Sequence, residues 1–285
     1  MKIILVDSQD PAHAPWLMGY LGAELDARER PVRRVIPVRP NCFVQIILDG
    51  EHQIIDIESG ERVPAPRVGL FGPLSHYRYD MEVTGPFRTF SARFQPAAAG
   101  RLFGVDPGAI VDRVMAIGLP PGLYEALHDA PDWGAMAELA DDWIASLTAG
   151  KSGEDPVAHA ARLLREAQGQ IGINELCEAT GLSMRHFQRR FRQLTGQNPK
   201  HYARICRVAH AVHLKELQPE VSWTTVAQEA GYSDQSHFIR DFKGLTGILP
   251  RDFLRFQTPI ERYPRWGEPR IGAVSALRSA SGRAP

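Results

Sequence analysis

The chain has 285 residues, of which 44% are hydrophobic and 23% are charged, and its formal net charge at pH 7 is zero. This composition excludes a disordered, collagen-like or disulfide-scaffold protein and favours a globular chain of about two domains. The charges are unevenly placed: residues 1–150 contain 13 Lys and Arg against 20 Asp and Glu, while the remaining residues contain 20 against 13. An acidic half joined to a basic half predicts that the basic half meets a polyanion.

The expected compartment follows from cysteine usage and from the shortness of the apolar runs. Cys42, Cys177 and Cys206 are odd in number and widely spaced, which favours a reducing compartment over a disulfide framework. The opening MKIILVDSQDPAH holds an apolar run far too short for a signal peptide, and no run approaches the roughly 18 apolar residues of a membrane span. We therefore expect a cytoplasmic protein with no membrane contact.

The first part of the chain predicts antiparallel β structure followed by helices. KIILVD predicts a strand, and residues 31–95 carry short apolar runs between Pro, Gly and Asp clusters. CFVQIILDG followed by EHQIIDIESGE predicts a hairpin that turns at Asp49-Gly50, a pair that tolerates positive φ. After about Gly100, VDPGAIVDRVMAIG and LYEALHDAPDWGAMAELADDWIASLTA have the apolar spacing of amphipathic helices. Residues 1–150 are thus expected to form a small, cupin-like antiparallel β barrel or sandwich with helices.

The second part predicts an all-α domain of about seven helices, which makes the whole chain α+β. Residues 149–155, AGKSGED, are small and polar and predict a linker. The helical segments beyond it are PVAHAARLLREAQG, INELCEAT, SMRHFQRRFRQL, PKHYARICRVAHAVHLKEL, WTTVAQEA, DQSHFIRDFKGL and PRDFLRF. The expected domains are residues 1–150 and 151–257, and residues 258–285, rich in Pro, Gly, Ser and Arg, are expected to be a disordered tail.

One unit occurs twice in the helical part. GLSMRHFQRRFRQLTGQNP, which begins at residue 181, returns as GYSDQSHFIRDFKGLTGILP from residue 231. The first landmarks match at an offset of 50 residues and the later ones at 51, so we place one inserted residue at the start of the second helix. The landmarks are Gly181, Ser183, Phe187, Phe191, Gly196 and Pro199, which match Gly231, Ser233, Phe238, Phe242, Gly247 and Pro250.

Each copy predicts a helix-turn-helix: a short helix, a turn centred on glycine, and a second helix with a Ser N-cap. Cys177 and Ala227 lie four residues before the turn glycines, and their small side chains allow the two helices to cross closely. In each second helix a Phe pair at i and i+4 makes one inward apolar stripe. The remaining faces of these helices are left for recognition.

The outward face of the first of these helices has the chemistry that reads a DNA major groove. It carries Arg185, His186, Gln188, Arg189 and Arg192, and no acidic residue occurs between positions 183 and 196. Arg can fork onto guanine and Gln onto adenine, while further Arg residues neutralise phosphates. The first copy is therefore expected to contribute more affinity than the second.

The second copy carries a less basic set of outward residues than the first. A long segment joins the two copies. The set is Gln235, Ser236, His237, Arg240 and Lys243, with Asp234 and Asp241 expected to dilute the charge. PKHYARICRVAHAVHLKEL would span about 27 Å as a helix. Such a rod could set the two reading helices about one DNA turn, roughly 34 Å, apart, so that one chain reads two adjacent major grooves.

Residues 156–256 resemble the double helix-turn-helix DNA-binding domain of AraC/XylS-type transcriptional regulators. The resemblance lies in TGLSMRHFQRRFRQLTGQNPKHYARICRVAHA and AGYSDQSHFIRDFKGLTGILPRDFLRF, with paired motifs, linker helix and both G-x-x-P endings in order. It implies double-stranded DNA and RNA polymerase as partners. Leu249, where the family has Ser or Thr, and Phe253, where it has Tyr, depart from the pattern outside the reading helices. The implied base-reading positions are Arg185, Gln188, Arg189, Gln235, Ser236 and Arg240, and Arg192 and Lys243 complete the expected DNA contacts.

The N-terminal part is similar to the β-rich sensor domains of such regulators, through GPLSHYRYDMEVTGPFRTFSARFQPAAAGRLFGV. This resemblance implies that residues 1–150 bind a small effector or mediate dimerisation, which would give a homodimer. His76, Tyr77, Tyr79 and Arg93 are the candidates to line an effector pocket. The alternative is that they are ordinary core or surface residues of a β domain.

No metal, cofactor or catalytic residue is expected. Cys206, His210 and His213 lie at i, i+4 and i+7 on one predicted helix, but no fourth ligand is evident, so we expect an inward cysteine and exposed histidines. GLSMR and GYSDQ lack the closing Gly of a G-x-S-x-G nucleophile turn. Residues 31–95 contain no H-x-H pair of the kind that a metal-dependent cupin enzyme would use.

The leading hypothesis is a sequence-specific DNA-binding transcriptional regulator, with activator as the expected class. Two alternatives remain open at this point. One is a bifunctional protein whose N-terminal cupin-like domain is an enzyme. The other is an architectural DNA binder without sequence preference, which would bind random and specific DNA with similar affinity.

Overall fold

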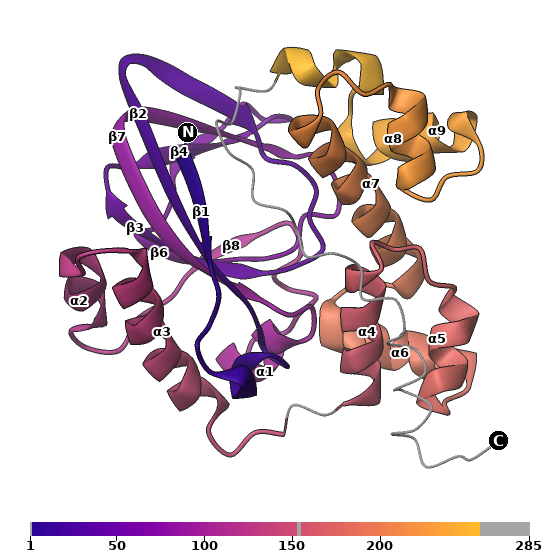
Figure 1. Ribbon diagram of the computed structural model, residues 1–285, viewed down its shortest axis with the longest axis horizontal. Helices are drawn as coiled ribbons and strands as arrows, with labels where there is room; N and C mark the ends of the chain where they lie inside the picture. Colours follow the sequence, from indigo (N-terminus) through magenta and orange to yellow (C-terminus); the bar gives the residue numbers. More distant parts are fainter. Residues whose placement is uncertain (1, 153–154, 257–285) are drawn as a thin grey trace.

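A computed structural model describes residues 2–152 and 155–256, and its fold is α+β, as the sequence predicts (Figure 1). The strands are β1 (Lys2–Val6), β2 (Leu17–Val35), β3 (Phe43–Asp49), β4 (His52–Asp56), β5 (Arg62–Pro64), β6 (Val68–Phe71), β7 (Tyr79–Phe94) and β8 (Val114–Ala116). The first helices are α1 (Ala98–Phe103), α2 (Leu123–Asp129) and α3 (Trp133–Thr148). We call residues 2–148 the sheet region. The predicted disordered tail, residues 258–285, lies outside the described residues.

The helical region, residues 156–256, has the segments that the sequence predicts. They are α4 (Pro156–Glu166), α5 (Ile173–Thr180), α6 (Met184–Thr195), α7 (Pro199–Leu217), α8 (Trp223–Glu229), α9 (Gln235–Thr246) and the 3-10 helix η2 (Pro250–Phe256). The spacing of apolar residues predicts these helices correctly, because each helix buries one apolar stripe against its neighbours. Within the described residues, no helix is long and apolar enough to cross a membrane.

β7 is the central strand of the sheet. It pairs antiparallel with β2 on one side, and with β3 and β4 in succession on the other. The order of the main path is β1-β2-β7-β3-β6-β8, with β5 joined to β4. β1 was expected from KIILVD and is confirmed.

The predicted hairpin at Asp49-Gly50 is wrong. β3 and β4 do not pair with each other; both run antiparallel to β7, from Phe43 opposite Arg93 to Asp56 opposite Tyr79. The two segments thus behave as one long strand interrupted beside Pro86 of β7. Gly50 has φ +72°, and a Cβ added there would lie 2.0 Å from the Pro86 carbonyl oxygen. Its tolerance of positive φ serves this close approach and not a chain reversal.

Three further segments differ from the expectation. After β1, β structure resumes at residue 17 and not near 31, because the first half of β2 is largely buried on both faces and so lacks a period of two. Residues 105–118 were expected to be helical, but they form turns followed by β8, which pairs with β6. Pro107 and Gly108 disfavour a helix in this segment. The backbone N–H and C=O groups of β8 are instead hydrogen-bonded to β6. The short helix α1 was not predicted.

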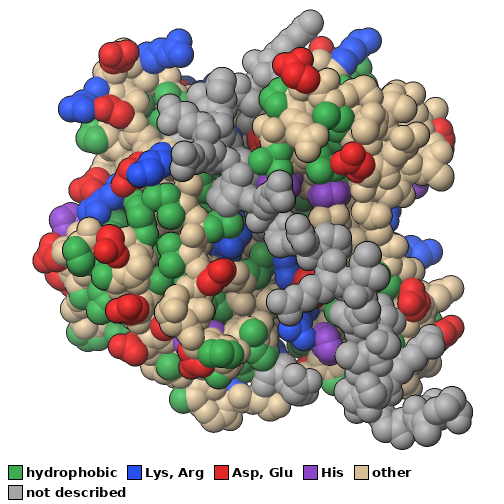
Figure 2. Space-filling view, in the orientation of Figure 1, with side chains coloured by type: hydrophobic (Ala, Val, Ile, Leu, Met, Phe, Trp, Pro, Cys, Tyr) green, Lys and Arg blue, Asp and Glu red, His purple; other side chains and the backbone are tan. Residues whose placement is uncertain are grey.

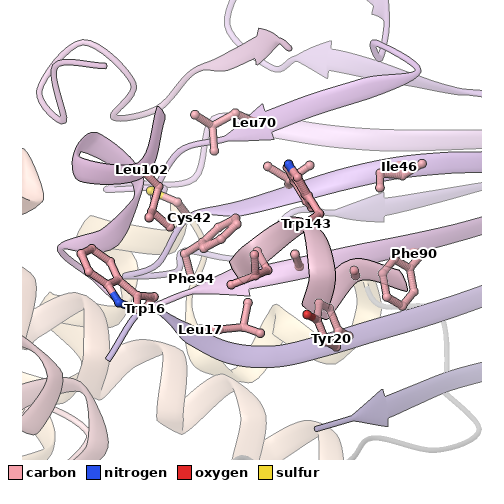
Figure 3. Close-up of a cluster of buried hydrophobic side chains, with 14 of the residues drawn as sticks. Trp16, Leu17, Tyr20, Cys42, Ile46, Leu70, Phe90, Phe94, Leu102 and Trp143 are labelled. Carbon is pink, nitrogen blue, oxygen red and sulfur yellow. The ribbon is translucent and has the colours of Figure 1, made fainter. Parts of the chain in front are cut away.

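The main core fills the space between the curved sheet and α3. Trp16, Tyr20, Phe90 and Phe94 belong to one buried cluster with Trp143 of α3, and Figure 3 labels all five. Tyr20 and Phe90 stack with ring centroids 5.2 Å apart. Burying an aromatic side chain contributes roughly 1.5–3 kcal/mol, so this cluster is a principal stabiliser of the sheet region.

A buried polar cluster ties the N-terminal segment to α3. Asp141 of α3 accepts hydrogen bonds from the Tyr20 hydroxyl (2.6 Å), the Ser8 hydroxyl (2.7 Å) and the Gln9 backbone N–H (2.8 Å). Nδ1 of His13 lies 3.3 Å from the same carboxylate. Burial, and next the hydrogen bond to Asp141, raise the pKa of Tyr20, so its hydroxyl stays protonated and donates.

Candidate nucleic-acid interface

Two helix pairs, α5–α6 and α8–α9, repeat one backbone frame. α6 and α9 both have 12 residues, and both end at a glycine in the left-handed region, Gly196 with φ +75° and Gly247 with φ +75°. The turn glycines Gly181 and Gly231 have φ +70° and +80°. Only glycine adopts such angles without cost, which explains why these four recur. Figure 1 places the two pairs one above the other, with α7 running between them.

The Phe pairs on the inward faces of the two units have similar ring geometry. Phe187 and Phe191 have ring centroids 5.8 Å apart at 52°, and Phe238 and Phe242 are 5.5 Å apart at 55°. All four rings are fully buried, as the sequence predicts. Each unit has its own apolar cluster, which includes Cys177 or Ala227 respectively. The recurring residues therefore build the fold and are not available for contacts with a partner.

The outward face of α6 presents unpaired cations. Arg185, Gln188, Arg189 and Arg192 are all exposed. Within the part of the chain that the structure describes, none of the three arginines has an ion pair. Arg190 differs, because its guanidinium is held by Asp155 at 2.6 Å. The predicted residues of this helix thus share one solvent-facing surface with a net positive charge.

The outward face of α9 presents Gln235, Ser236, Arg240 and Lys243, which are exposed as predicted. Asp241 was expected to dilute the charge of this face, and that expectation is wrong. Its carboxylate is buried and contacts Arg204 of α7 (3.0 Å), the Tyr232 hydroxyl (3.3 Å) and His237 Nε2 (3.5 Å).

Asp234 is exposed, and its carboxylate has a structural role at the start of α9. Its side chain accepts hydrogen bonds from the backbone N–H groups of Ser236 (2.9 Å) and His237 (3.1 Å), so it is the N-cap of α9. The predicted Ser N-cap is therefore wrong in the second unit. In the first, Ser183 occupies the N-cap position, but its side chain makes no capping hydrogen bond. The residue inserted in the second unit therefore lies in the turn before α9. Every residue of α9 is 51 positions after its counterpart in α6.

This difference in capping can be measured. We expect Asp234→Ala to lower the free energy of unfolding by about 1 kcal/mol, because two N–H groups of the first turn lose their acceptor. Ser183→Ala is the matched control and should change it by less than about 0.5 kcal/mol. Urea unfolding followed by circular dichroism compares the two, and equal losses would contradict the capping assignment.

The constant offset reveals an outward residue that the sequence reasoning missed. Ile239 occupies in α9 the place that Gln188 occupies in α6, yet its side chain is 37% exposed. It lines a shallow depression of about 490 Å³ on the face of α9. The residues around this depression are Ser236, Ile239, Arg240, Lys243 and Gly244. Counting from the C-terminal glycines Gly196 and Gly247 would have found this residue.

The candidate effector residues do not form one group. His76 and Tyr79 both approach Asp112: His76 Nδ1 lies 3.6 Å from its carboxylate, and the Tyr79 hydroxyl donates to its carbonyl oxygen at 3.0 Å. The Tyr77 hydroxyl donates to Asp80 at 2.6 Å. Burial is the first cause that raises the pKa of both tyrosines. Arg93 lies near the opposite end of β7, paired with Phe43 and Gly19, and is buried.

The sheet region contacts the C-terminal ends of both reading helices. The Tyr77 backbone N–H donates to the Leu245 carbonyl at the end of α9 (2.5 Å). A Cβ at Gly196, which ends α6, would lie 2.4 Å from the Pro107 carbonyl oxygen. A third link is the buried ion pair between Arg34 of β2 and Glu216 of α7, at 4.0 Å. Two of these three links thus lie where a reading helix stops, away from the outward faces, and the third lies on α7.

The cysteine and histidines of α7 are packed inside the helical region. Cys206 is buried as predicted, but His213 is also buried and His210 is half-buried, so the expected exposure of the histidines is wrong. Burial lowers the pKa of each histidine to about 4, which keeps both rings neutral at pH 7. Across residues 2–152 and 155–256, the structure shows no group of three or more His, Cys, Asp or Glu side chains placed to hold a metal ion.

Known proteins share the C-terminal part of this chain. Residues 176–255 match a family described as a helix-turn-helix domain. Over 83 residues the chain is 32% identical to the HTH-type transcriptional activator RhaS of Escherichia coli O139:H28 (strain E24377A) and 31% identical to RhaS of E. coli K12 DH10B. These residues make up 29% of this chain and 30% of each relative, so the match spans less than a third of the curated relatives' length. ToxT from Vibrio cholerae O395 superposes with a TM-score of 0.48 at 9% identity, over 84% of this chain and 97% of ToxT.

Proposed function

Since the helical region of this chain carries a double helix-turn-helix domain of the AraC/XylS type, we propose that the protein is a sequence-specific DNA-binding transcriptional regulator. In this proposal residues 151–257 bind double-stranded DNA. Residues 1–150 form a domain that binds a small effector or mediates homodimerisation. RNA polymerase is the further partner, and activation is the expected effect, by analogy with the activators that match.

The observation that supports the proposal most directly is the charge on α6. Its outward face holds Arg185, Arg189 and Arg192 without an acidic neighbour, whereas Arg190 on the same helix is neutralised by Asp155. Keeping three guanidinium groups unpaired on one face is unfavourable for a helix alone, and a polyanion relieves it. Figure 2 shows acidic side chains over α2 and α3 and also over the helical region, so the difference in charge rests on the sequence, where residues 1–150 carry 13 Lys and Arg against 20 Asp and Glu and the remaining residues carry 20 against 13.

The mechanism that we assign is insertion of α6 and α9 into adjacent major grooves. Arg185 and Arg189 fork onto guanine edges and Gln188 onto adenine, while Arg192 contacts a phosphate. In the second unit Gln235, Ser236 and Arg240 read bases and Lys243 contacts a phosphate; α7, 19 residues long, sets the spacing. The contacts of the sheet region with the ends of α6 and α9 would transmit what it binds to both units.

The proposal is tested on α6 with duplexes selected from a random pool by the full-length protein. We expect Arg189→Ala to weaken binding by roughly 5- to 150-fold and to relax the preference at one base pair. Arg192→Ala should weaken binding to all sequences about equally and reduce the salt slope by about one. Gel-shift titrations over a range of salt concentrations measure both effects.

Arg190→Ala is the matched control, because it removes the same side chain from the same helix but from a position held by Asp155. Its base preference should equal that of the unsubstituted protein. If neither Arg189→Ala nor Arg192→Ala impairs binding, α6 does not read DNA. Discrimination between selected and random duplexes of less than about a thousandfold would instead identify an architectural DNA binder.

A further inference from the structure

We infer that Ile239 reads the 5-methyl group of a thymine in the major groove, so that the second unit selects a T·A pair at one fixed position. This inference rests on the proposed function, and it adds to the predicted contacts a residue, Ile239, and the base that its side chain would select. It starts from a side chain whose exposure has no structural explanation in the fold.

Ile239 is an apolar side chain on a polar surface. It is one of four exposed large hydrophobic residues in the described part of the chain, with Ile57, Val63 and Leu182. Its neighbours one turn away on the same face are Ser236 at i−3 and Lys243 at i+4, which are DNA-contacting candidates. The apolar cluster of the unit includes Phe238 and Phe242, which are fully buried, and Ile239 is not part of that cluster.

The comparison with α6 shows what this position does. Gln188 holds the equivalent place on an equivalent backbone, and its amide can pair with the N6 and N7 atoms of adenine. Ile239 has neither a donor nor an acceptor on its side chain. The thymine 5-methyl is the apolar group that base pairs display in the major groove, so it is the feature that a branched aliphatic side chain can recognise there. The two units thus present opposite chemistries at one position.

The surface around Ile239 has room for a base edge. Gly244 stands where α6 has Gln193, and a Cβ added at Gly244 would meet no atom within 4 Å. The missing side chain contributes to the depression of about 490 Å³ whose wall includes Ile239. A base edge can therefore approach the backbone of α9 more closely than the backbone of α6.

The charges around the depression favour nucleic acid over a protein partner. Arg240 and Lys243 line it, and neither has an ion pair among the residues that the structure describes. Neither Asp234 nor Asp241 lines the depression: Asp241 faces the interior and contacts Arg204, and Asp234 caps the start of the helix. Ile239 can contact a thymine methyl group while Arg240 and Lys243 contact the phosphates on either side of it.

The test removes the methyl group from the DNA and the side chain from the protein. A selected duplex is scanned by replacing each thymine with uracil, which lacks only the 5-methyl, and each duplex is titrated with the full-length protein. We expect one uracil to weaken binding roughly fourfold, the effect of one buried methyl group. With Ile239→Ala the same uracil should have no effect, and the two single changes should not add. With Ile239→Gln we expect the preference at that position to change from thymine to adenine.

Two control variants complete the design. Gln188→Ala should retain the uracil effect, because it alters the other unit, and Val63→Ala, an exposed apolar residue of the sheet region, should change neither affinity nor preference. Thermal unfolding checks that Ile239→Ala is folded. If the unsubstituted protein binds DNA selectively but no uracil position depends on residue 239, the inference is wrong and the proposed function stands. If the protein selects no sequence at all, both fail.

Discussion

Gly50→Ala is expected to lower the free energy of unfolding by about 4 kcal/mol, the largest effect of any single substitution considered for this protein. The added Cβ would lie 2.0 Å from the Pro86 carbonyl oxygen and 3.1 Å from its carbonyl carbon. Both atoms belong to the backbone of β7, which is paired on both sides and cannot shift without breaking its ladders with β2, β3 or β4. Because the added Cβ would clash with backbone atoms, no side chain can move away to relieve the overpacking.

Gly60→Ala is the matched control for this substitution. Gly60 also has φ +72°, so both variants carry the same cost of a left-handed alanine, about 1–2 kcal/mol. Nothing lies within 4 Å of a Cβ at Gly60, which is in the loop between β4 and β5. The difference between the two variants in urea unfolding isolates the clash with Pro86. Equal losses would mean that β3 and β4 are not interrupted beside β7 in the way the structure shows.

The second large effect is expected from Asp141→Ala, which should lower the free energy of unfolding by about 3 kcal/mol. The substitution removes the acceptor of three hydrogen bonds and leaves the hydroxyl of Tyr20 buried without it. Asp142→Ala is the control, since Asp142 is the next residue of α3 and is exposed. Its effect should stay within about 0.5 kcal/mol.

The contribution of Asp141 should also depend on pH in a defined direction. Burial, the largest single influence, raises the pKa of this carboxyl, but the hydrogen bonds from Tyr20, Ser8 and Gln9 together lower it below its ordinary value. A lowered folded-state pKa stabilises the protein fully above the unfolded pKa of about 3.9, and this stabilisation is lost as the pH falls through the folded pKa. The stability difference between the unsubstituted protein and Asp141→Asn should therefore narrow below about pH 4. Unfolding at pH 7 and pH 3 measures it, and a widening difference would contradict the assigned shift.

The sequence predicts the helical region far better than the sheet region, for a physical reason. Contacts within a helix join residues three and four positions apart, so the stripe of Phe187 and Phe191 is legible in the chain itself. Pairing within a sheet joins distant segments: β2 and β7 are aligned from Leu17 opposite Phe94 to Val35 opposite Asp80. Asp49-Gly50 has the composition of a hairpin turn. However, β3 and β4 both pair with β7 and not with each other, and those two residues alone do not reveal this.

The candidate site shows the same division. The exposed residues on α6 and α9 were predicted correctly as exposed, because the position of each Phe pair fixes which helix face is outward. The burial of Asp241 was missed, since it depends on Arg204 of α7, 37 residues away in the chain. The equivalence of Ile239 and Gln188 follows from the offset of 51 that aligns the Phe pairs, but Ile239 was missed because only polar side chains were taken as candidate contacts.

The sequence by itself determined that the chain holds two copies of one helix-turn-helix unit, with a basic first reading helix, because repetition and helical periodicity are local properties. The tertiary structure decided the rest. It placed Asp234 in a helix cap and Asp241 in an interior ion pair, and so removed the charge of Asp241 from the second reading face. It also brought Tyr77 and Pro107 against the ends of the two reading helices. These outcomes depend on which distant groups compete for the same partner, and only the folded chain settles that competition.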